Sequence, residues 1–344
     1  MMLFLLLLVP LFSFGETCGS INYLTAKDSP FEKIPVIDQD GAGICYAVTA
    51  SQLMNYHLIK TKQATTPLVH PAWAALKSSR KVLEGGFEED AVNMTETAGI
   101  CEFSKVEDAL NAFGNNSGLT GNALVGFLET YAIEINKASN KSSEEHLEHA
   151  YYAAQDVASP FCSEDIIWEK IHPELASLNG TSVQIFSKLF ADQCASANLR
   201  HPKIPRATTQ IVQTDQDAPE KLALVRNGPI AIGYCASAWD NSGYEGQPSP
   251  RNPKEADKNC GDHSSLVVGR KMIDNKCNYL VRNSYGTGWG SWNENRKCIC
   301  RHKVTREWVD ECTVDKQSPE DYTVEACYMG KTQLERNLTT VTTL

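Results

Sequence analysis

The chain has few positive charges for its size, and none of them forms a basic run. It carries 32 Lys and Arg against 42 Asp and Glu among 344 residues, a formal net charge of −10. Nucleic acid binding requires Lys and Arg to neutralise phosphates, so this composition excludes nucleic acid as a partner. Beyond the first 14 residues, no stretch is long and apolar enough to cross a bilayer, which excludes stable membrane insertion.

Motifs for metals and nucleotides are also missing. The 12 cysteines include no Cys-x-x-Cys pair, and the lone Cys298-Ile299-Cys300 run is weak evidence for zinc. His146 and His149 do not have the spacing of a His-Glu-x-x-His site and are typical of a solvated helix face. The glycines from Gly286 to Gly290 lack both the dinucleotide spacing and the Gly-Lys-Ser/Thr of a phosphate loop. We therefore expect no metal and no cofactor.

The N-terminal segment is strongly apolar. Residues Met1 to Phe14 are almost wholly apolar and too short to span a bilayer, as in a secretory signal peptide. Ser13 and Gly15 supply the small residues that signal peptidases require, so we expect cleavage before Glu16. Twelve cysteines fit an oxidising compartment. The sequence thus predicts a protein that is secreted or delivered to another oxidising compartment, whether extracellular, lysosomal, vacuolar or periplasmic.

Cys45 stands at the start of a predicted helix. Helix-compatible residues continue from Cys45 to about Lys62, with apolar residues at helical spacing on one face, and Gly41 and Gly43 just before it allow a sharp turn. The positive field of a helix N-terminus favours the thiolate, which is the reactive form of cysteine. This placement is typical of an activated nucleophile. The alternative is a buried structural cysteine on an amphipathic helix.

A cysteine nucleophile needs a histidine base and a third group that orients the histidine ring. Of the eight histidines, only His263 stands at the head of an apolar, β-branched run that predicts a buried strand. The next predicted strand, Asn278 to Ser284, contains Asn283, and a turn at Asp274 to Lys276 joins the two strands. This hairpin carries His263 and Asn283 near its two ends.

These residues resemble the active-site motifs of the papain-like cysteine proteases. Gln39 lies six residues before Cys45, which sits in a Gly-x-Cys-aromatic-Ala sequence. Asn283 opens Asn-Ser-Tyr-Gly-Thr-Gly-Trp-Gly, where the family has Asn-Ser-Trp-Gly-x-x-Trp-Gly. The resemblance implies that Cys45 is the nucleophile, His263 the base and Asn283 the group that holds it. It also implies that Gln39 and the Cys45 backbone N–H form the oxyanion hole.

The same resemblance implies a substrate-binding set. Glu84-Gly85-Gly86-Phe87 lies about 40 residues beyond Cys45, where the family has a Gly-Gly pair whose backbone bonds the extended substrate. Trp289 is expected to shield the Asn-His hydrogen bond from water, and Tyr285 replaces a family tryptophan. The acidic run Glu88 to Asp90 favours either basic substrates or an exposed, solvated loop. The residues expected to bind substrate are Gly85, Gly86, Phe87, Glu88, Gly233, Asp262, Ser264 and Trp289.

The chain departs from the family pattern in three respects. His263 and Asn283 lie much further beyond Cys45 than in the family, which predicts an insertion at about 116–205. The capping-box pattern Ser142-x-x-Glu145 predicts that this insertion is largely helical. The family's disulfide near the nucleophile is replaced by Ala42 and Leu83, so both halves are lost together. No inhibitory prosegment separates the predicted cleavage site from Cys45. We therefore expect that the enzyme is made active, or that the insertion or a proteinaceous inhibitor restrains it.

The expected fold class is α+β, a two-lobed papain-like fold with a largely helical insertion. A helical lobe at about 40–115 carries the nucleophile, and an antiparallel β lobe at about 206–301 carries the histidine and asparagine. With the insertion, these lobes form a peptidase domain at 16–301, after a signal peptide at 1–15. A C-terminal extension at 302–344 is expected to end in a disordered stretch, Thr339 to Leu344. By the resemblance, Cys260 pairs with Cys298, Cys300 or Cys312.

The sequence therefore predicts a secreted cysteine peptidase that hydrolyses peptide or protein substrates through a thioester, with Cys45, His263 and Asn283 as its catalytic set. Two alternatives remain open at this stage. One is a non-catalytic binding protein on the same scaffold. The other is an acyl-transfer enzyme, a ligase or transamidase, which would use the same nucleophile and base.

Overall fold

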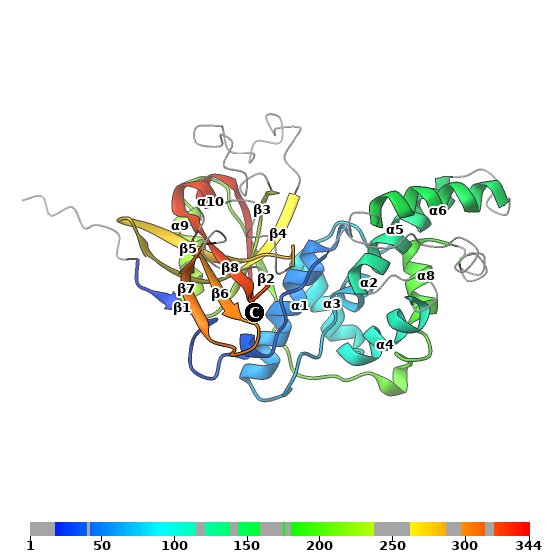
Figure 1. Ribbon diagram of the computed structural model, residues 1–344, viewed down its shortest axis with the longest axis horizontal. Helices are drawn as coiled ribbons and strands as arrows, with labels where there is room; N and C mark the ends of the chain where they lie inside the picture. The colour runs from blue at the N-terminus through cyan, green and yellow to red at the C-terminus, as the bar shows by residue number, and fades with distance from the viewer. Residues whose placement is uncertain are drawn as a thin grey trace, which may run out of the picture.

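Figure 1 shows the computed structural model of the chain, which describes residues 18–39, 42–114, 121–137, 144–158, 175, 180–236, 262–286, 297–313 and 320–344. The expected signal peptide, Cys260 and Trp289 lie outside these described residues. None of the helices within the described ranges combines the length and apolar character that a membrane span requires.

Helices fill one side of the molecule (Figure 1). In chain order they are α1 (Cys45–Lys60), α2 (Pro71–Ser78), α3 (Glu88–Ala98), α4 (Phe103–Gly114), α5 (Gly121–Lys137), α6 (Glu144–Ala158) and α8 (Ser182–Leu189). Local capping fixes several of their starts. At α8, the Thr181 hydroxyl accepts a bond from the Gln184 N–H while the Gln184 side chain accepts one from the Thr181 N–H, which is a capping box.

An antiparallel sheet forms the other side. Its strands are β1 (Ile21–Asn22), β2 (Thr208–Ile211), β3 (Ile230–Cys235), β4 (Asp262–Ile273), β5 (Lys276–Arg282), β6 (Cys298–His302), β7 (Trp308–Cys312), β8 (Tyr322–Gly330) and β9 (Leu338–Thr343). The order across the sheet is β2-β9-β3-β4-β5-β8-β6-β7, and β1 pairs with β4. Short helices α9 (Ala218–Leu222) and α10 (Lys331–Asn337) accompany it. The predicted α+β class is confirmed.

The β4–β5 hairpin forms where the sequence predicts it. Asp274 and Asn275 in its turn have φ angles of 50° and 59°, a left-handed conformation that Asp and Asn tolerate better than other non-glycine residues. The register places Leu266 opposite Arg282. Asn283, the next residue, therefore comes to the end of β4 that carries His263.

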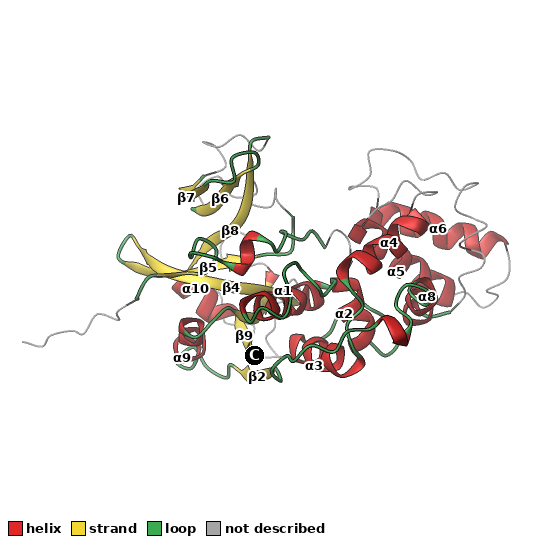
Figure 2. Ribbon diagram, turned by 90° about the horizontal axis from the view of Figure 1, so that it is seen from below, coloured by secondary structure: helices red, strands yellow, loops and turns green. Residues whose placement is uncertain are grey.

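Helix α1 lies between the other helices and the sheet (Figure 2), packed against α2, α3 and β4. The predicted apolar face is buried, and Ala47 and Met54 have no exposed surface. However, polar residues on other faces are buried as well. The Asn55 side chain, for example, accepts bonds from the Leu68 and Val69 N–H groups at 2.8 and 2.9 Å. The helix is therefore enclosed on nearly all sides rather than amphipathic, which holds its N-terminus rigidly between the two parts of the fold.

The region expected to be an insertion contributes α5, α6 and α8, so the described part of it is largely helical, as predicted. Leu128, Tyr151 and Phe186 from these helices share a hydrophobic cluster with residues of α1. The capping-box serine predicted to open α6 lies outside the described residues. At the start of α5, the Asn122 side-chain amide donates to the Asp38 carbonyl oxygen, so this region reaches the residue next to Gln39.

The C-terminal end is ordered, and the expectation of disorder from Thr339 onward is wrong. β9 pairs with β2 on one side and with β3 on the other. Its sequence, Leu-Thr-Thr-Val-Thr-Thr, is mostly β-branched, and Val341 and Thr342 are buried in the sheet. A threonine-rich sequence is therefore retained as a strand by pairing on both edges. The sheet also continues beyond residue 301 through β7 and β8.

Four disulfides join described cysteines: Cys18–Cys277, Cys101–Cys194, Cys298–Cys327 and Cys300–Cys312. Cys235 is also disulfide-bonded. The partners expected for Cys260 are therefore wrong, because all three pair with other cysteines. The sheet register explains the Cys298–Cys327 bond, because it places Cys298 directly opposite Cys327. Disulfides of this number fit an oxidising compartment.

Candidate active site

His263 and Asn283 meet at the end of the β4–β5 hairpin, as the sequence predicts. The His263 Nε2 lies 2.6 Å from the Asn283 Oδ1, and both residues are buried. The same oxygen accepts bonds from the Ser265 hydroxyl at 3.0 Å and the Ser284 N–H at 2.8 Å. Because an amide oxygen only accepts, the imidazole proton must sit on Nε2. The Nδ1 lone pair of neutral His263 is thus left available to take a proton.

Two aromatic rings enclose His263. The Tyr285 ring is stacked on the imidazole, with centroids 4.8 Å apart and planes inclined by 26°. The Tyr234 ring meets it edge-on at 5.5 Å. The family resemblance assigned the shielding role to Trp289, which lies outside the described residues. Tyr285 is therefore a site residue that the prediction underrated, and its signal was its position two residues after Asn283.

Cys45 is the first residue of α1 and is the free cysteine among those described. A backbone hydrogen bond from Ser264, the residue after His263, reaches its thiol, and the backbone groups of Tyr46 and Cys45 itself also favour the thiolate. Burial outweighs these bonds, so the pKa of Cys45 is raised, and the charge of Glu88 raises it further. The Ser264 bond places the Cys45 thiol beside the strand that carries His263.

Burial also determines the charge state of His263. Desolvation lowers the pKa of His263 to about 4, and the hydrogen bond with Asn283 opposes this shift only in part. A raised thiol pKa and a lowered imidazole pKa both favour the uncharged forms. The enclosed site therefore stabilises a thiol and a neutral imidazole when no substrate is present.

Gln39 is tied to the sheet beside Asn283. Its N–H donates to the Ser284 carbonyl oxygen at 2.7 Å, and its side-chain oxygen accepts a bond from the Ser284 hydroxyl. Its side-chain nitrogen donates to the Ala42 carbonyl at 3.1 Å. These bonds fix the amide group on the loop that leads into Cys45. One N–H of the amide remains for a further acceptor, as an oxyanion hole requires.

The glycine pair lies against the loop before Cys45. The Gly85 N–H donates to the Gly43 carbonyl at 2.9 Å, and Gly85 has a φ of +74°, which favours glycine. A Cβ on Gly86 would lie 2.6 Å from an atom of the Tyr46 ring, so a larger residue would not fit. Phe87 follows and is 66% exposed. The Gly85 hydrogen bond and the close approach of Gly86 to Tyr46 thus hold the pair near Cys45.

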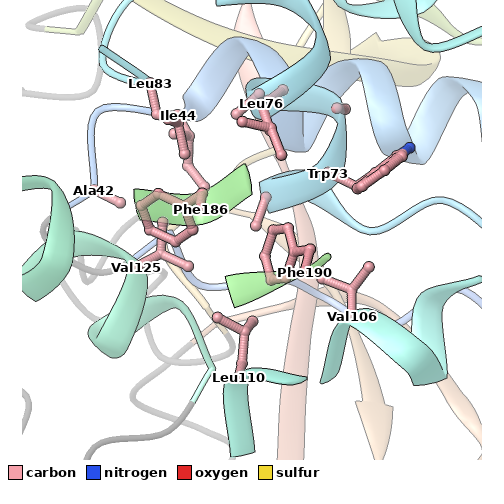
Figure 3. Close-up of a cluster of buried hydrophobic side chains, with 14 of the residues drawn as sticks. Ala42, Ile44, Trp73, Leu76, Leu83, Val106, Leu110, Val125, Phe186 and Phe190 are labelled. Atoms are coloured by element: carbon pink, nitrogen blue, oxygen red, sulfur yellow. The ribbon is translucent and has the colours of Figure 1, made fainter. Parts of the chain in front are cut away.

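Two apolar residues, Ala42 and Leu83, stand where the papain-like pattern has a disulfide. Ala42 and Leu83 are both buried in one hydrophobic cluster with Ile44, Val125 and Phe186, drawn in Figure 3. The Leu83 N–H is also bonded to a carboxylate oxygen of Glu129 at 3.0 Å. Apolar packing and this buried hydrogen bond therefore hold Leu83 in place without the disulfide that the papain-like pattern has at this position.

Of the other residues predicted to bind substrate, three lie together and one is exposed at the end of the ladder. Gly233 and Ser264 are paired across β3 and β4, and Glu88 is buried next to Ser264. Asp262 pairs with Cys235 at the end of the same ladder and is exposed. The sequence left open whether the acidic run was a solvated loop. For Glu88 it is not, because helix α3 begins at this residue and directs it inward.

The described residues contain no group of three His, Cys, Asp or Glu side chains arranged to hold a metal ion. Searches of protein-family models and of curated proteins find no match. Solved structures do match. Xylellain, a cysteine protease from Xylella fastidiosa, is 12% identical with a TM-score of 0.44, covering 94% of this chain and 86% of its own.

Two further matches are precursors. A recombinant stem bromelain precursor is 13% identical, with a TM-score of 0.41, over 90% of this chain and 69% of its own. Digestive procathepsin L2 from the Tenebrio molitor larval midgut is 12% identical, with a TM-score of 0.39, over 90% of this chain and 67% of its own. These three are papain-like cysteine proteases.

Measured against the papain-like motifs, the structure joins Gln39, Cys45, His263 and Asn283 through a short chain of contacts. Gln39 bonds to Ser284, and Cys45 bonds to the residue after His263. The site also contains residues that those motifs do not specify. Ser265 donates to the orienting asparagine, and Tyr234 covers the imidazole.

Proposed function

We propose that this chain is a papain-like cysteine peptidase that hydrolyses peptide bonds through a thioester on Cys45. The observation that carries the proposal is the 2.6 Å bond between His263 Nε2 and Asn283 Oδ1. This bond leaves His263 Nδ1 free to act as a base. The next residue, Ser264, bonds the Cys45 thiol through its backbone. A structural cysteine would not need a buried, oriented and neutral histidine nearby. The combination is instead that of a nucleophile with its base and an orienting group.

The first step is attack on the substrate carbonyl. As the Cys45 sulfur forms its bond to the carbonyl carbon, the thiol proton passes to His263 Nδ1, and the carbonyl oxygen takes the negative charge. The Gln39 side-chain N–H and the Cys45 backbone N–H donate to that oxygen. Because both resting groups are uncharged, the ion pair forms only as the reaction proceeds, in contrast to a pair that is charged before substrate binds.

The second step releases the amine. The carbon–nitrogen bond breaks, and the proton on His263 Nδ1 passes to the leaving nitrogen, which leaves a thioester on Cys45. Water then attacks the thioester carbon while His263 Nδ1 takes a proton from it. The carbon–sulfur bond breaks, the carboxylic acid leaves, and the proton returns to the sulfur. Asn283 holds the ring throughout, and Tyr285 limits access of water to it.

Alkylation by an epoxysuccinyl peptide, followed by mass-spectrometric mapping, tests this proposal. We expect labelling at Cys45 that is lost in His263→Ala and retained in the control His302→Ala, a histidine of β6 outside the site. A folded protein that is not labelled at Cys45 and does not cleave peptides would instead favour a binding protein. Product analysis with an added amine would reveal acyl transfer, since a ligase or transamidase would form the amide rather than the acid.

The rest of the proposal concerns how the protein is exported and how its proposed peptidase activity is restrained. We propose that the N-terminal apolar segment directs the protein to an oxidising compartment, which the disulfides among described residues support. We also propose that α5 contributes to restraint or substrate access, because Asn122 bonds the backbone next to Gln39. N-terminal sequencing of the exported protein would test the first idea. Peptide cleavage by Asn122→Ala, which removes only this contact, would test the second.

A further inference from the structure

Glu88 is a buried carboxyl group beside the nucleophile. It has 5% of its surface exposed, and its charge acts on the Cys45 thiol. No Lys or Arg of the described residues forms an ion pair with it, although a buried carboxylate is normally paired. Burial accordingly raises the pKa of Glu88, and the neighbouring Ser264 hydroxyl opposes this rise. The structure thus maintains an unpaired acid next to its reactive sulfur, at a cost in stability.

The sheet beneath Glu88 is lined by small and hydroxyl-bearing residues. Gly233 lies opposite Ser264 on β4 and opposite Thr340 on β9. Residues directly opposite in an antiparallel pair direct their side chains to the same face of the sheet, so these three form one row. A Cβ on Gly233 would lie 2.5 Å from the Thr340 Oγ1, which shows that this hydroxyl leans over the glycine. We call this row of Thr340, Gly233 and Ser264 the hydroxyl floor.

The hydroxyl floor has unused hydrogen-bonding capacity. The Ser264 Oγ is buried and has no partner at hydrogen-bond distance among the described residues, although it lies near enough to the Glu88 carboxyl to lower its pKa. Gly233 and Thr340 are partly exposed, so the floor is open at one end. Glu88 stands at the other end, next to Ser264. A substrate side chain that crossed the floor would meet hydroxyl oxygens first and a carboxylate last, all of which accept hydrogen bonds.

We propose that Glu88 is a specificity-determining residue that selects substrates with a Lys or Arg side chain on the acyl side of the scissile bond, bound over the hydroxyl floor. This inference rests on the proposed function, because Cys45 must bind the acyl group. Glu88 follows the Gly85-Gly86 pair by two residues, and that pair is the backbone proposed to bond the acyl part of the substrate. A lysine ammonium offers three donors, which match the acceptors Thr340, Ser264 and Glu88.

Peptidyl coumarin amides that differ only at one of the two residues before the scissile bond test this selection. Lysine is compared with norleucine, which has a similar chain without the charge. For the natural protein we expect kcat/KM to favour lysine by about tenfold or more at one of these positions, because truncation of a buried charge pair is costly. In Glu88→Gln the lysine-to-norleucine ratio should fall to about one.

The control is Asp90→Asn, which removes one negative charge from the exposed side of the same first helical turn and should leave the ratio unchanged. A natural protein that cleaves both peptides equally well would overturn the selection by Glu88 while the proposed function stands. If neither peptide is cleaved and iodoacetamide does not alkylate Cys45, the proposed function fails and the inference fails with it. Should Glu88→Gln not fold, as judged by circular dichroism, the ratio for the natural protein decides alone.

Discussion

The hydroxyl of Tyr285 lies 3.5 Å from Nδ1 of His263, while its ring covers the imidazole. Nδ1 is the nitrogen that takes the thiol proton in the proposed reaction. A tryptophan, which the papain-like motif has at this position, supplies the ring without a hydroxyl. Tyr285 therefore combines two effects that substitutions can separate, since phenylalanine removes the hydroxyl and alanine removes both.

Tyr285→Ala should raise the pKa of His263. Burial lowers this pKa to about 4, and loss of the ring would admit water that stabilises the imidazolium. In Tyr285→Phe the ring remains, so the pKa should stay well below its ordinary value. Titration of the His263 ring protons by nuclear magnetic resonance measures both variants. An unchanged titration in Tyr285→Ala would show that Tyr285 does not shield the base.

Asn283→Ala should reduce kcat/KM by about 10- to 100-fold, which corresponds to one hydrogen bond to a group that becomes charged. The ring of His263 would lose the acceptor that keeps its proton on Nε2. Ser265→Ala is the matched control, because it removes a different donor to the same oxygen and leaves the histidine bond intact. Steady-state kinetics compare the two. Equal losses would mean that Asn283 acts through general packing.

Gln39→Ala should slow acylation by about 100- to 1,000-fold, as expected for one donor of an oxyanion hole. The loss should appear in kcat rather than in KM, because the bond strengthens only when the oxyanion forms. Gln63→Ala serves as the control, since it removes a glutamine amide that bonds the Lys203 backbone outside the site. Full activity of Gln39→Ala would exclude Gln39 from the oxyanion hole.

Glu88→Gln should lower the pKa of Cys45, because the Glu88 charge contributes to raising it. Thiolate is the form that reacts, so the midpoint of the pH profile for alkylation by iodoacetamide should move to lower pH. Asp90→Asn, which is further into solvent, should shift the midpoint much less. A midpoint that moves upward, or equally in both variants, would contradict the placement of Glu88 beside the sulfur.

Glu325→Gln should destabilise the protein by about 3 kcal/mol, because it leaves the buried Arg282 guanidinium without its carboxylate. Arg282 is fully buried and precedes Asn283 directly, so the effect should reach the site. Asp310→Asn is the control, since its pair with Lys271 is partly exposed and worth about 1 kcal/mol or less. Chemical denaturation measures both. A loss for Glu325→Gln no larger than for the control would show that water already solvates the pair.

The sequence predicted which residues meet at the candidate site because their positions are signalled locally. A nucleophile at a helix start, a histidine at a strand head and an asparagine after the next strand are local signals, and the hairpin register carries them into contact. The hydrogen bonds of Gln39 to Ser284 add the fourth member. The helix start, the strand head and the hairpin are short segments, and the conformation of each is determined largely by its own residues.

Features that depend on distant pairing could not be predicted in the same way. The β9 strand has a polar, threonine-rich sequence that is ordered only because β2 and β3 flank it. The burial of Glu88 depends on β4, which lies far away in the chain. The disulfide between Cys298 and Cys327 follows from sheet register, which spacing along the chain does not reveal. Local patterns carry no information about which strand becomes a neighbour.

The disulfide between Cys18 and Cys277 closes a covalent ring of the chain that contains every described helix except α10, together with Cys45 and His263. The proposed peptidase activity would expose the chain to cleavage by its own copies. A single cut anywhere inside this ring leaves both pieces joined through sulfur, so a nicked molecule keeps its two lobes together and migrates as one species until it is reduced. Cleavage of the backbone therefore does not separate the lobes, which come apart only after the disulfide is also reduced.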